Sequence, residues 1–175
     1  MGFERIGGEE VWAGRIASVR VDRFRYDDGE EAEREIVAHP GAVAIVPCVE
    51  THVWLIRQPR EICGEEALLE IPAGKLDKPG EDLRAAAERE LAEEIGKAAG
   101  SWALLTRFYT SPGFAAEEVH VYVATELKDA QPSDAEEDER LELVEVPLAH
   151  LDDVIAECRD AKSLVGLLWF RAFHR

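Results

Sequence analysis

The sequence has no apolar run long enough to cross a membrane. Hydrophobic residues make up 46% of its 175 residues, yet runs such as Ala42 to Val46 fall far short of the roughly 20 residues that a spanning helix needs. The first ten residues, MGFERIGGEE, are polar and acidic, so the basic and apolar regions of a secretory signal peptide are missing. Residues 2 to 6 also lack the serine or threonine of a myristoylation site. We expect no membrane anchor.

Cysteine is scarce, and the three cysteines are far apart, at Cys48, Cys63 and Cys158. The absence of a CxxC pair argues against a zinc knuckle. An odd number of dispersed cysteines is typical of reduced thiols. We therefore expect a cytoplasmic protein without a structural disulfide.

Positive charge is also in short supply. The chain has 20 lysines and arginines against 37 aspartates and glutamates, and its formal net charge is -17. Such a surface repels the phosphates of nucleic acids, so we expect no nucleic-acid partner. It would repel a small phosphate substrate in the same way. Any phosphate chemistry therefore requires bound cations or a local arginine cluster.

The length suits one domain with a hydrophobic core, and periodicity predicts an α+β fold in which a sheet lies between helices. The segment from Asp27 to Gly29 is a predicted turn. The predicted strands span 19–26, 33–38, 41–49, 53–57, 102–108, 119–124 and 141–146. The predicted helices span 83–95, 148–158 and 163–174. The acidic segment 130–140 reads as a loop.

The central predicted helix has an apolar face repeating every four residues, at Leu83, Ala87, Leu91 and Ile95. The preceding Asp82 is suited to cap its N-terminus. A glycine, Gly96, follows the last apolar position and predicts where the helix ends. This helix should therefore pack one face against the core.

Three glutamates of this helix, Glu90, Glu93 and Glu94, lie within about a quarter of its circumference, off the apolar face. Carboxylates this close repel one another unless cations intervene. Hard divalent cations such as magnesium prefer oxygen ligands, and Arg89 can pair with Glu93 at the i+4 spacing. Taken alone, the glutamates favour a solvated acidic surface; the residues around them favour a metal site.

Residues 74 to 97, GKLDKPGEDLRAAAERELAEEIGK, resemble the Nudix box. That motif is a glycine, five residues, a glutamate, seven residues, then R-E-U-x-E-E-x-G-U, in which U is apolar. The matching positions are Gly74, Glu81, Arg89, Glu90, Leu91, Glu93, Glu94 and Gly96. Two positions depart from the pattern, because six residues separate Gly74 from Glu81 and the final apolar position is Lys97. The match lies on the expected loop and helix.

Segments outside the box resemble the ADP-ribose pyrophosphatase branch of the Nudix family. Upstream these are REIVAHPGAVAIVP, LIRQPR and LEIPAG; downstream, SPGF places Pro112 15 residues beyond Lys97. The resemblance implies a mixed sheet between helices, and hydrolysis of ADP-ribose to AMP and ribose 5-phosphate. It implies an N-terminal strand region at residues 1–40, which serves dimerisation, and a catalytic domain at residues 41–175.

The resemblance also assigns roles to the box residues. Glu90 and Glu94 would be metal ligands, Glu93 would bind metal or a metal-bound water, and the carbonyl of Ala73 would add a ligand. The metal would be Mg²⁺, for which Mn²⁺ can substitute. A general base would come from the acidic loop EEDERLEL, with Glu137 and Glu139 as candidates; without the box, this loop reads as a disordered acidic segment.

Further residues are predicted to bind the substrate. Arg57 and Arg60 are candidates for the diphosphate, because arginine grips phosphate oxygens bidentately; a structural ion pair is the alternative for Arg57. Candidates for the distal ribose are Ser111, Gly113 and Glu117. The resemblance to this branch implies a homodimer in which the N-terminal strands cross over, so that Ile16, Arg34 and Glu35 reach the neighbour's nucleotide; the alternative is that these strands cap their own sheet. No partner is evident for His52, His120 and His150, which we interpret as structural.

Two rival functions stay open at this point. The substrate can be another nucleoside diphosphate sugar, although the NADH and coenzyme A signatures of the family are absent. A non-catalytic Nudix module that senses a nucleotide belongs to a different class. Such a module would be expected to lose box glutamates, and all of them are present.

Overall fold

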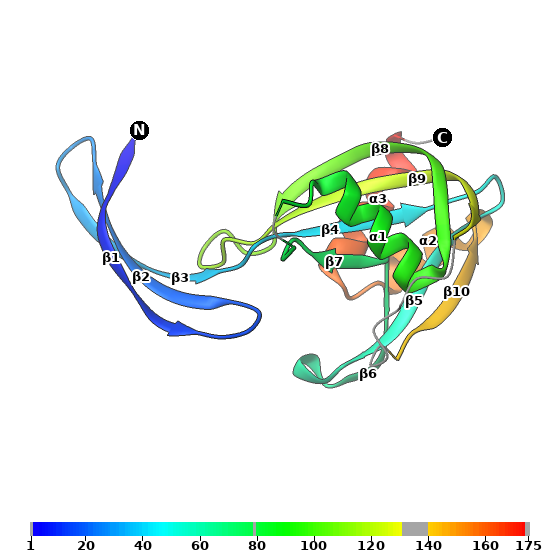
Figure 1. Cartoon of the computed structure of the whole chain (residues 1–175), viewed down its shortest axis with the longest axis horizontal. Coiled ribbons are helices and arrows are strands. Elements are labelled where there is room, and N and C mark those ends of the chain that lie inside the picture. The colour runs from blue at the N-terminus through cyan, green and yellow to red at the C-terminus, as the bar shows by residue number, and fades with distance from the viewer. Residues whose placement is uncertain (1, 79, 131–139, 174–175) are drawn as a thin grey trace. The chain divides into compact units, whose positions relative to one another are not determined.

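The computed structural model describes residues 2–78, 80–130 and 140–173. The chain forms two compact units. The first consists of Met1–Gly41 with Tyr109–Glu118, and the second of Ala42–Phe108 with Val119–Arg175. Figure 1 shows the elements of both units along the chain.

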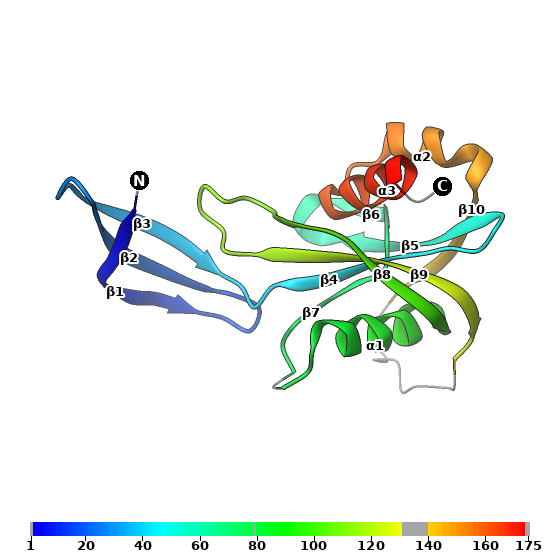
Figure 2. The same cartoon turned by 90° about the horizontal axis from the view of Figure 1, so that it is seen from above.

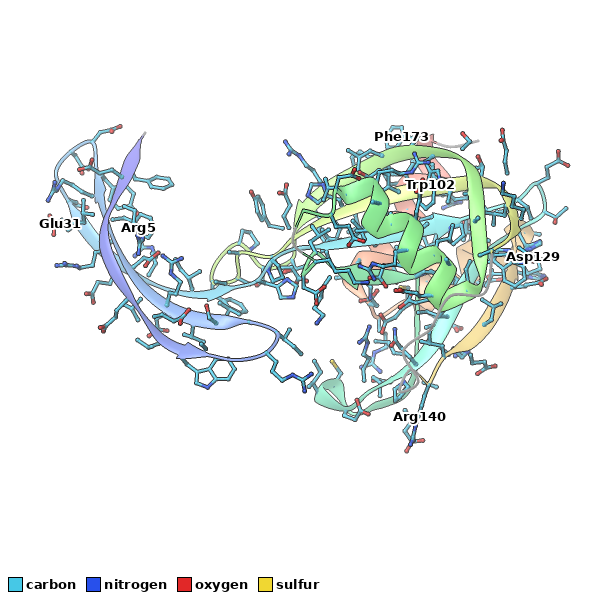
Figure 3. The ribbon with its side chains drawn as sticks, in the orientation of Figure 1. Arg5, Glu31, Trp102, Asp129, Arg140 and Phe173 are labelled. Carbon is cyan, nitrogen blue, oxygen red and sulfur yellow. The ribbon has the colours of Figure 1, made fainter. Side chains whose placement is uncertain are left out.

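The first unit contains a three-stranded antiparallel sheet of β1 (Phe3–Ala13), β2 (Ser18–Tyr26) and β3 (Glu31–Ala38), in that order. Gly29 adopts a φ of 87° in the predicted turn, and its amide donates to the Tyr26 carbonyl at 3.0 Å. Buried Asp22 accepts hydrogen bonds from Arg20, at 2.8 Å, and from Arg5 of β1, which Figure 3 labels, at 2.9 Å. The ion pair of Arg5 with Asp22 therefore ties β1 to β2, whereas Arg20 pairs with Asp22 within β2.

The second unit contains two sheets. A four-stranded sheet has the order β7 (Ala73–Lys75), β4 (Ala42–Pro47), β9 (Glu118–Asp129), β8 (Lys97–Tyr109). It is mixed, because β4 pairs antiparallel with β7 and parallel with β9. A three-stranded sheet has the order β10 (Glu142–Pro147), β5 (His52–Arg60), β6 (Glu65–Glu70). The far ends of β8 and β9, at Tyr109 and Glu118, belong to the first unit.

Helices cover both faces of these strands. Figure 2 shows α1 (Leu83–Ile95) on one side and α2 (Leu151–Glu157) and α3 (Ala161–Phe173) on the other. The fully buried strand β4 alternates between two apolar clusters. Val43 and Ile45 belong to the cluster of α1, whereas Val46 belongs to the cluster that contains Leu167 and Phe170 of α3. The predicted sheet between helices is confirmed.

The central helix begins and ends as predicted. The carboxylate of Asp82 accepts the amide hydrogen of Ala85 at 2.8 Å. Gly96 adopts a left-handed φ of 66° and donates its amide to the carbonyl of Ala92. Ala87 and Leu91 of the predicted apolar face are fully buried. The box residues therefore lie on a helix whose two ends are fixed.

The structure differs from the predictions at several elements. Strands β1, β6 and β7 extend or add to the predicted set. The predicted helix 148–158 is instead a 3₁₀ turn at Leu148–His150 followed by α2. Among the described residues, no helix combines the length and apolarity that a bilayer crossing requires. All three cysteines are free, as predicted, and burial raises the pKa of Cys48 to about 11.

Candidate active site

Strand β7 brings the glycine of the motif, Gly74, against the side chain of Glu90. The side chain of Glu90 is buried, and a Cβ atom on Gly74 would overlap its carboxyl group. Only a residue without a side chain fits this close approach. The first glycine of the motif therefore makes room for the Glu90 carboxylate.

The second β7 contact fixes another box glutamate. The backbone amide of Ala73 donates to Oε2 of Glu94 at 2.9 Å. Ala73 and Gly74 are consecutive, so one short strand contacts both Glu94 and Glu90 of α1. Ala73 itself pairs with Ala44 of the buried strand β4, which anchors the site to the core of the second unit.

Arg89 joins the helix glutamates to the loop before α1. Its guanidinium donates to both oxygens of Glu81 at 3.0 Å, to Glu90 at 2.6 Å and to Glu93 at 2.8 Å. The predicted i+4 pair of Arg89 with Glu93 is confirmed. Hydrogen bonding to Arg89 lowers the pKa of Glu81. The extra loop residue thus leaves Glu81 in a bidentate pair with Arg89.

The donor set suits a hard divalent cation. Three carboxylates, Glu81, Glu90 and Glu93, share the single positive charge of Arg89, so negative charge is in excess there. Carboxylate and carbonyl oxygens are the ligands that magnesium and calcium prefer. Within residues 2–78, 80–130 and 140–173, no three His, Cys, Asp or Glu side chains are arranged as a formed metal site. In this arrangement Arg89 and the Ala73 amide engage the glutamate oxygens instead.

The two predicted diphosphate arginines differ in their surroundings. Arg60 at the end of β5 donates to buried Glu70 through Nε at 2.7 Å and Nη2 at 2.8 Å. This hydrogen bonding is the main cause of a raised Arg60 pKa, to which the charge of Glu94 adds. The half-buried side chain of Arg57 makes no hydrogen bond or ion pair with another described residue. Of the two arginines, Arg60 forms an ion pair with a described residue, Glu70.

The first unit contains an open groove of about 550 Å³. Of the predicted substrate residues, Arg34, Glu35 and Gly113 line it, and Nη2 of Arg34 donates to the Tyr26 hydroxyl at 3.0 Å. Aromatic residues make up much of the remaining wall: Phe3, Phe24, Tyr26, Tyr109 and Phe114. Sequence reasoning missed Phe3, which lies on the unpredicted strand β1, and Tyr109, which ends β8; Phe114 belongs to the SPGF segment but was not itself predicted to bind substrate.

The other predicted residues of the first unit lie outside the groove wall. Ile16 is exposed in the turn between β1 and β2. The backbone carbonyl of Ser111 accepts the amides of Phe114 and Ala115, at 3.1 and 2.8 Å, and so shapes the SPGF turn. Glu117 accepts a hydrogen bond from the Thr110 hydroxyl at 2.9 Å.

The candidate bases and two of the histidines were also singled out in the sequence. Glu137 and Glu139, the candidate bases, lie outside the described residues. His52 lies edge-on to Trp54, with ring centroids 5.1 Å apart. His150 lies 3.5 Å from Asp153 on the surface.

The chain matches the family described as NUDIX domain over residues 38–164. A Bacillus methanolicus protein named "Methanol dehydrogenase activator" is 39% identical over 167 residues, which cover 93% of this chain and 89% of that protein. An "ADP-ribose pyrophosphatase" of Bacillus subtilis (strain 168) is 38% identical over 170 residues, covering 95% and 91%. The crystal structure of an ADP compounds hydrolase superposes with a TM-score of 0.83 at 28% identity, covering 98% of this chain and 93% of that chain. The chain therefore belongs to the Nudix family.

Proposed function

We propose that the protein hydrolyses the diphosphate of ADP-ribose to AMP and ribose 5-phosphate in a metal-dependent reaction. The observation that carries this proposal is the arrangement of Glu90 and Glu94 against the Ala73–Gly74 strand. The similarity to an ADP-ribose pyrophosphatase over 95% of the chain supports the choice of substrate.

In this proposal Glu90, Glu93, Glu94 and the Ala73 carbonyl hold the cation, which is Mg²⁺, with Mn²⁺ as a substitute. When bound, the cation supplies charge neutralisation and a more acidic water. The chain's own contribution is positional. The Ala73 amide orients Glu94, Gly74 leaves room for Glu90, and Arg89 restrains Glu93.

We assign the diphosphate to Arg60 and Arg57, because an arginine fork matches phosphate oxygens. The distal ribose is assigned to Ser111, Gly113 and Glu117. Either Glu137 or Glu139 would act as the general base. Replacing each of these two with Gln separates them, since loss of the base lowers kcat far more than it raises KM.

The groove of the first unit suits an adenine ring. Phe3, Phe24 and Tyr26 offer ring faces, and Arg34 and Glu35 offer polar groups to the edge of a base. Ile16 is the third residue that we assign to nucleotide binding. The combination of apolar wall and few polar groups is typical of small-molecule sites.

We further propose a homodimer formed through the first unit. Strand β1 and the turn that follows it leave large apolar side chains exposed, and a twofold interface would bury them. These residues are Phe3, Val11, Trp12 and Ile16. Light scattering at low micromolar concentration measures the mass, and a monomer would refute this assembly. A cytoplasmic location is supported by the three free cysteines.

The function is tested by measuring release of the nucleoside monophosphate, which is AMP from ADP-ribose, ADP-glucose and NADH and GMP from GDP-mannose. ADP-ribose should have the highest kcat/KM, chelation should abolish turnover, and Mg²⁺ or Mn²⁺ should restore it. A tenfold or greater preference for GDP-mannose would show the rival nucleotide-sugar activity. Binding of ADP-ribose without turnover of any substrate would show the non-catalytic module.

The metal residues are tested with a matched pair of helix variants. Glu94→Gln should reduce kcat by roughly a thousandfold, since a bound cation contributes several kcal/mol to the transition state. Glu88→Gln is the control, because Glu88 lies on the same helix but is exposed and paired with Arg84 at 2.8 Å. Equal effects of the two substitutions would contradict the assignment of Glu94.

A further inference from the structure

A buried carboxylate connects the predicted diphosphate arginine to the C-terminal helix. Glu70, at the end of β6, is 1% exposed and accepts both hydrogen bonds of Arg60. Lys162, in the first turn of α3, donates to Oε2 of the same carboxylate, the oxygen that also accepts from Nη2 of Arg60. Arg60 and Lys162 are about a hundred residues apart in sequence, yet they share one negative charge.

The start of α3 is held firmly enough to place this lysine. Asp160 accepts the amide of Ser163 at 3.0 Å and also contacts Nζ of Lys162 at 3.0 Å. The hydroxyl of Ser163 in turn accepts the amide of Ile71, next to Glu70, at 2.8 Å. The side chain of Lys162 is only 16% exposed. Its ammonium group is therefore a fixed charge rather than a mobile surface one.

The charge balance shows what this lysine contributes. An arginine in a bidentate pair with one buried glutamate is neutralised, and it offers little attraction to a phosphate. Lys162 adds one positive charge to the same carboxylate and so leaves Arg60 less completely neutralised. Asp160 offsets part of that charge, but its carboxylate is also stabilised by the positive N-terminus of α3. Removing the charge of Lys162 makes the local net charge more negative by one unit, whatever the net charge of the group is.

We propose that Lys162 is a positioning residue for the diphosphate, acting through Glu70 to keep the Arg60 guanidinium oriented and available for phosphate oxygens. This inference rests on the proposed function, in which Arg60 binds a diphosphate. It makes α3, which carries none of the box residues, part of the substrate-binding apparatus. It also explains why a charged residue, Glu70, is buried between Leu69 and Ile71.

The first test removes the charge of Lys162 while keeping its length. Lys162→Met should raise KM for ADP-ribose about tenfold, as one fixed charge near a diphosphate contributes on this scale, and should change kcat much less. Lys162→Arg should restore KM. The matched control is Arg171→Met, which removes one positive charge from the same helix at an exposed pair with Asp152; its KM should match that of the wild type. Circular dichroism establishes that each variant is folded.

A charge-restoring double variant separates positioning from packing. Glu70→Gln with Lys162→Met returns the local charge to its original value, and the Gln oxygen still accepts a hydrogen bond from Arg60. KM should therefore recover to within about threefold of the wild type, which is well inside the tenfold loss expected from one charge. A structural role predicts the opposite, because two substitutions disturb the packing more than one. A double variant as poor as Lys162→Met, or poorer, overturns the proposal.

Inorganic pyrophosphate provides a readout that does not depend on ADP-ribose turnover. Its dissociation constant, measured by isothermal titration calorimetry, should rise about tenfold in Lys162→Met and recover in the double variant. If the wild type hydrolyses no ADP-ribose but pyrophosphate behaves in this way, the proposed function fails and the inference stands. If the wild type hydrolyses ADP-ribose while Lys162→Met leaves both KM and pyrophosphate affinity unchanged, the inference fails alone.

Discussion

The close approach of Gly74 to Glu90 makes Gly74→Ala a sharp perturbation of the site. The new methyl group would overlap the Glu90 carboxyl group, whereas nonbonded carbon atoms rest about 3.5 Å or more apart. Glu90 is buried and hydrogen-bonded to Arg89 at 2.6 Å, so it cannot swing freely into solvent. Either the carboxylate moves by about 1 Å or more, or strand β7 moves away from α1.

Both relaxations displace residues assigned to the cation, because β7 also carries the Ala73 amide that holds Glu94. A misplacement of about 1 Å can cost on the order of a hundredfold in rate, and overpacking costs about 1 to 3 kcal/mol of stability. We therefore expect Gly74→Ala to remain folded at 25 °C while kcat for ADP-ribose falls about a hundredfold.

Steady-state kinetics and thermal melting measure the two effects separately. The control is Gly64→Ala, since Gly64 has a left-handed φ of 68° but no atom within 4 Å of an added Cβ. That substitution should cost about 1 to 2 kcal/mol through backbone strain, with kcat preserved. A wild-type kcat in Gly74→Ala, or an equal loss of kcat in both variants, would refute the conclusion that Gly74 makes room for the Glu90 carboxylate.

Three further expectations follow from other parts of the chain. Burial opposes ionisation of Glu70, but hydrogen bonds from Arg60 and Lys162 outweigh the effect of burial and lower the pKa of Glu70. The stabilisation that ionised Glu70 contributes to the fold is therefore complete above the ordinary pKa of about 4.3. It is lost as the pH falls through the lowered pKa. Glu70→Gln should thus cost about 2 kcal/mol at pH 7 and progressively less in acid, as guanidinium unfolding at several pH values would show. Mass spectrometry after iodoacetamide treatment at pH 8 should find exposed Cys63 alkylated well before Cys48, whose pKa burial raises to about 11; equal rates would contradict the buried position. Lys97→Leu should change the free energy of unfolding by less than about 1 kcal/mol, because its ion-pair partner Asp129 is exposed, and a larger loss in urea unfolding would show that this departure from the box is structurally important.

The helix and its ends were predictable because their signals are local. Asp82, the apolar repeat and Gly96 lie within 15 consecutive positions, and each acts on its near neighbours. The same holds for the Arg89–Glu93 pair. The fixed spacing of the Nudix box also predicted the fold, because in that family the box helix packs against a mixed sheet. That fold is confirmed by the TM-score of 0.83 to an ADP compounds hydrolase.

Strand β1 was largely missed for physical reasons. Gly7 and Gly8 lie in its middle, and glycine has a low preference for strands. The pairing with β2 also shifts register between Arg5 and Gly7, which breaks the alternation that a sequence reading depends on. The strand is stabilised instead by tertiary contacts, such as the ion pair of Arg5 with Asp22.

Contacts of the site between residues far apart in the sequence could not be predicted either. Nothing near Lys162 indicates that it contacts Glu70, because the pair depends on how α3 packs against β6. One signal was present: Glu70 lies between Leu69 and Ile71, and a charge within an apolar strand predicts a buried partner. The sequence does not say which lysine or arginine that partner is.

The two arginines of the second unit's site show how surroundings, rather than residue type, determine a role. Arg89 faces three carboxylates, so its charge is fully engaged and its function is to hold Glu81, Glu90 and Glu93 in place. Arg60 faces one carboxylate that Lys162 also neutralises. In a chain with a net charge of -17, a second base that shares the acidic partner of Arg60 leaves this arginine more available to a diphosphate. The sharing of Glu70 is therefore the local arrangement that lets a strongly acidic protein attract a doubly phosphorylated substrate.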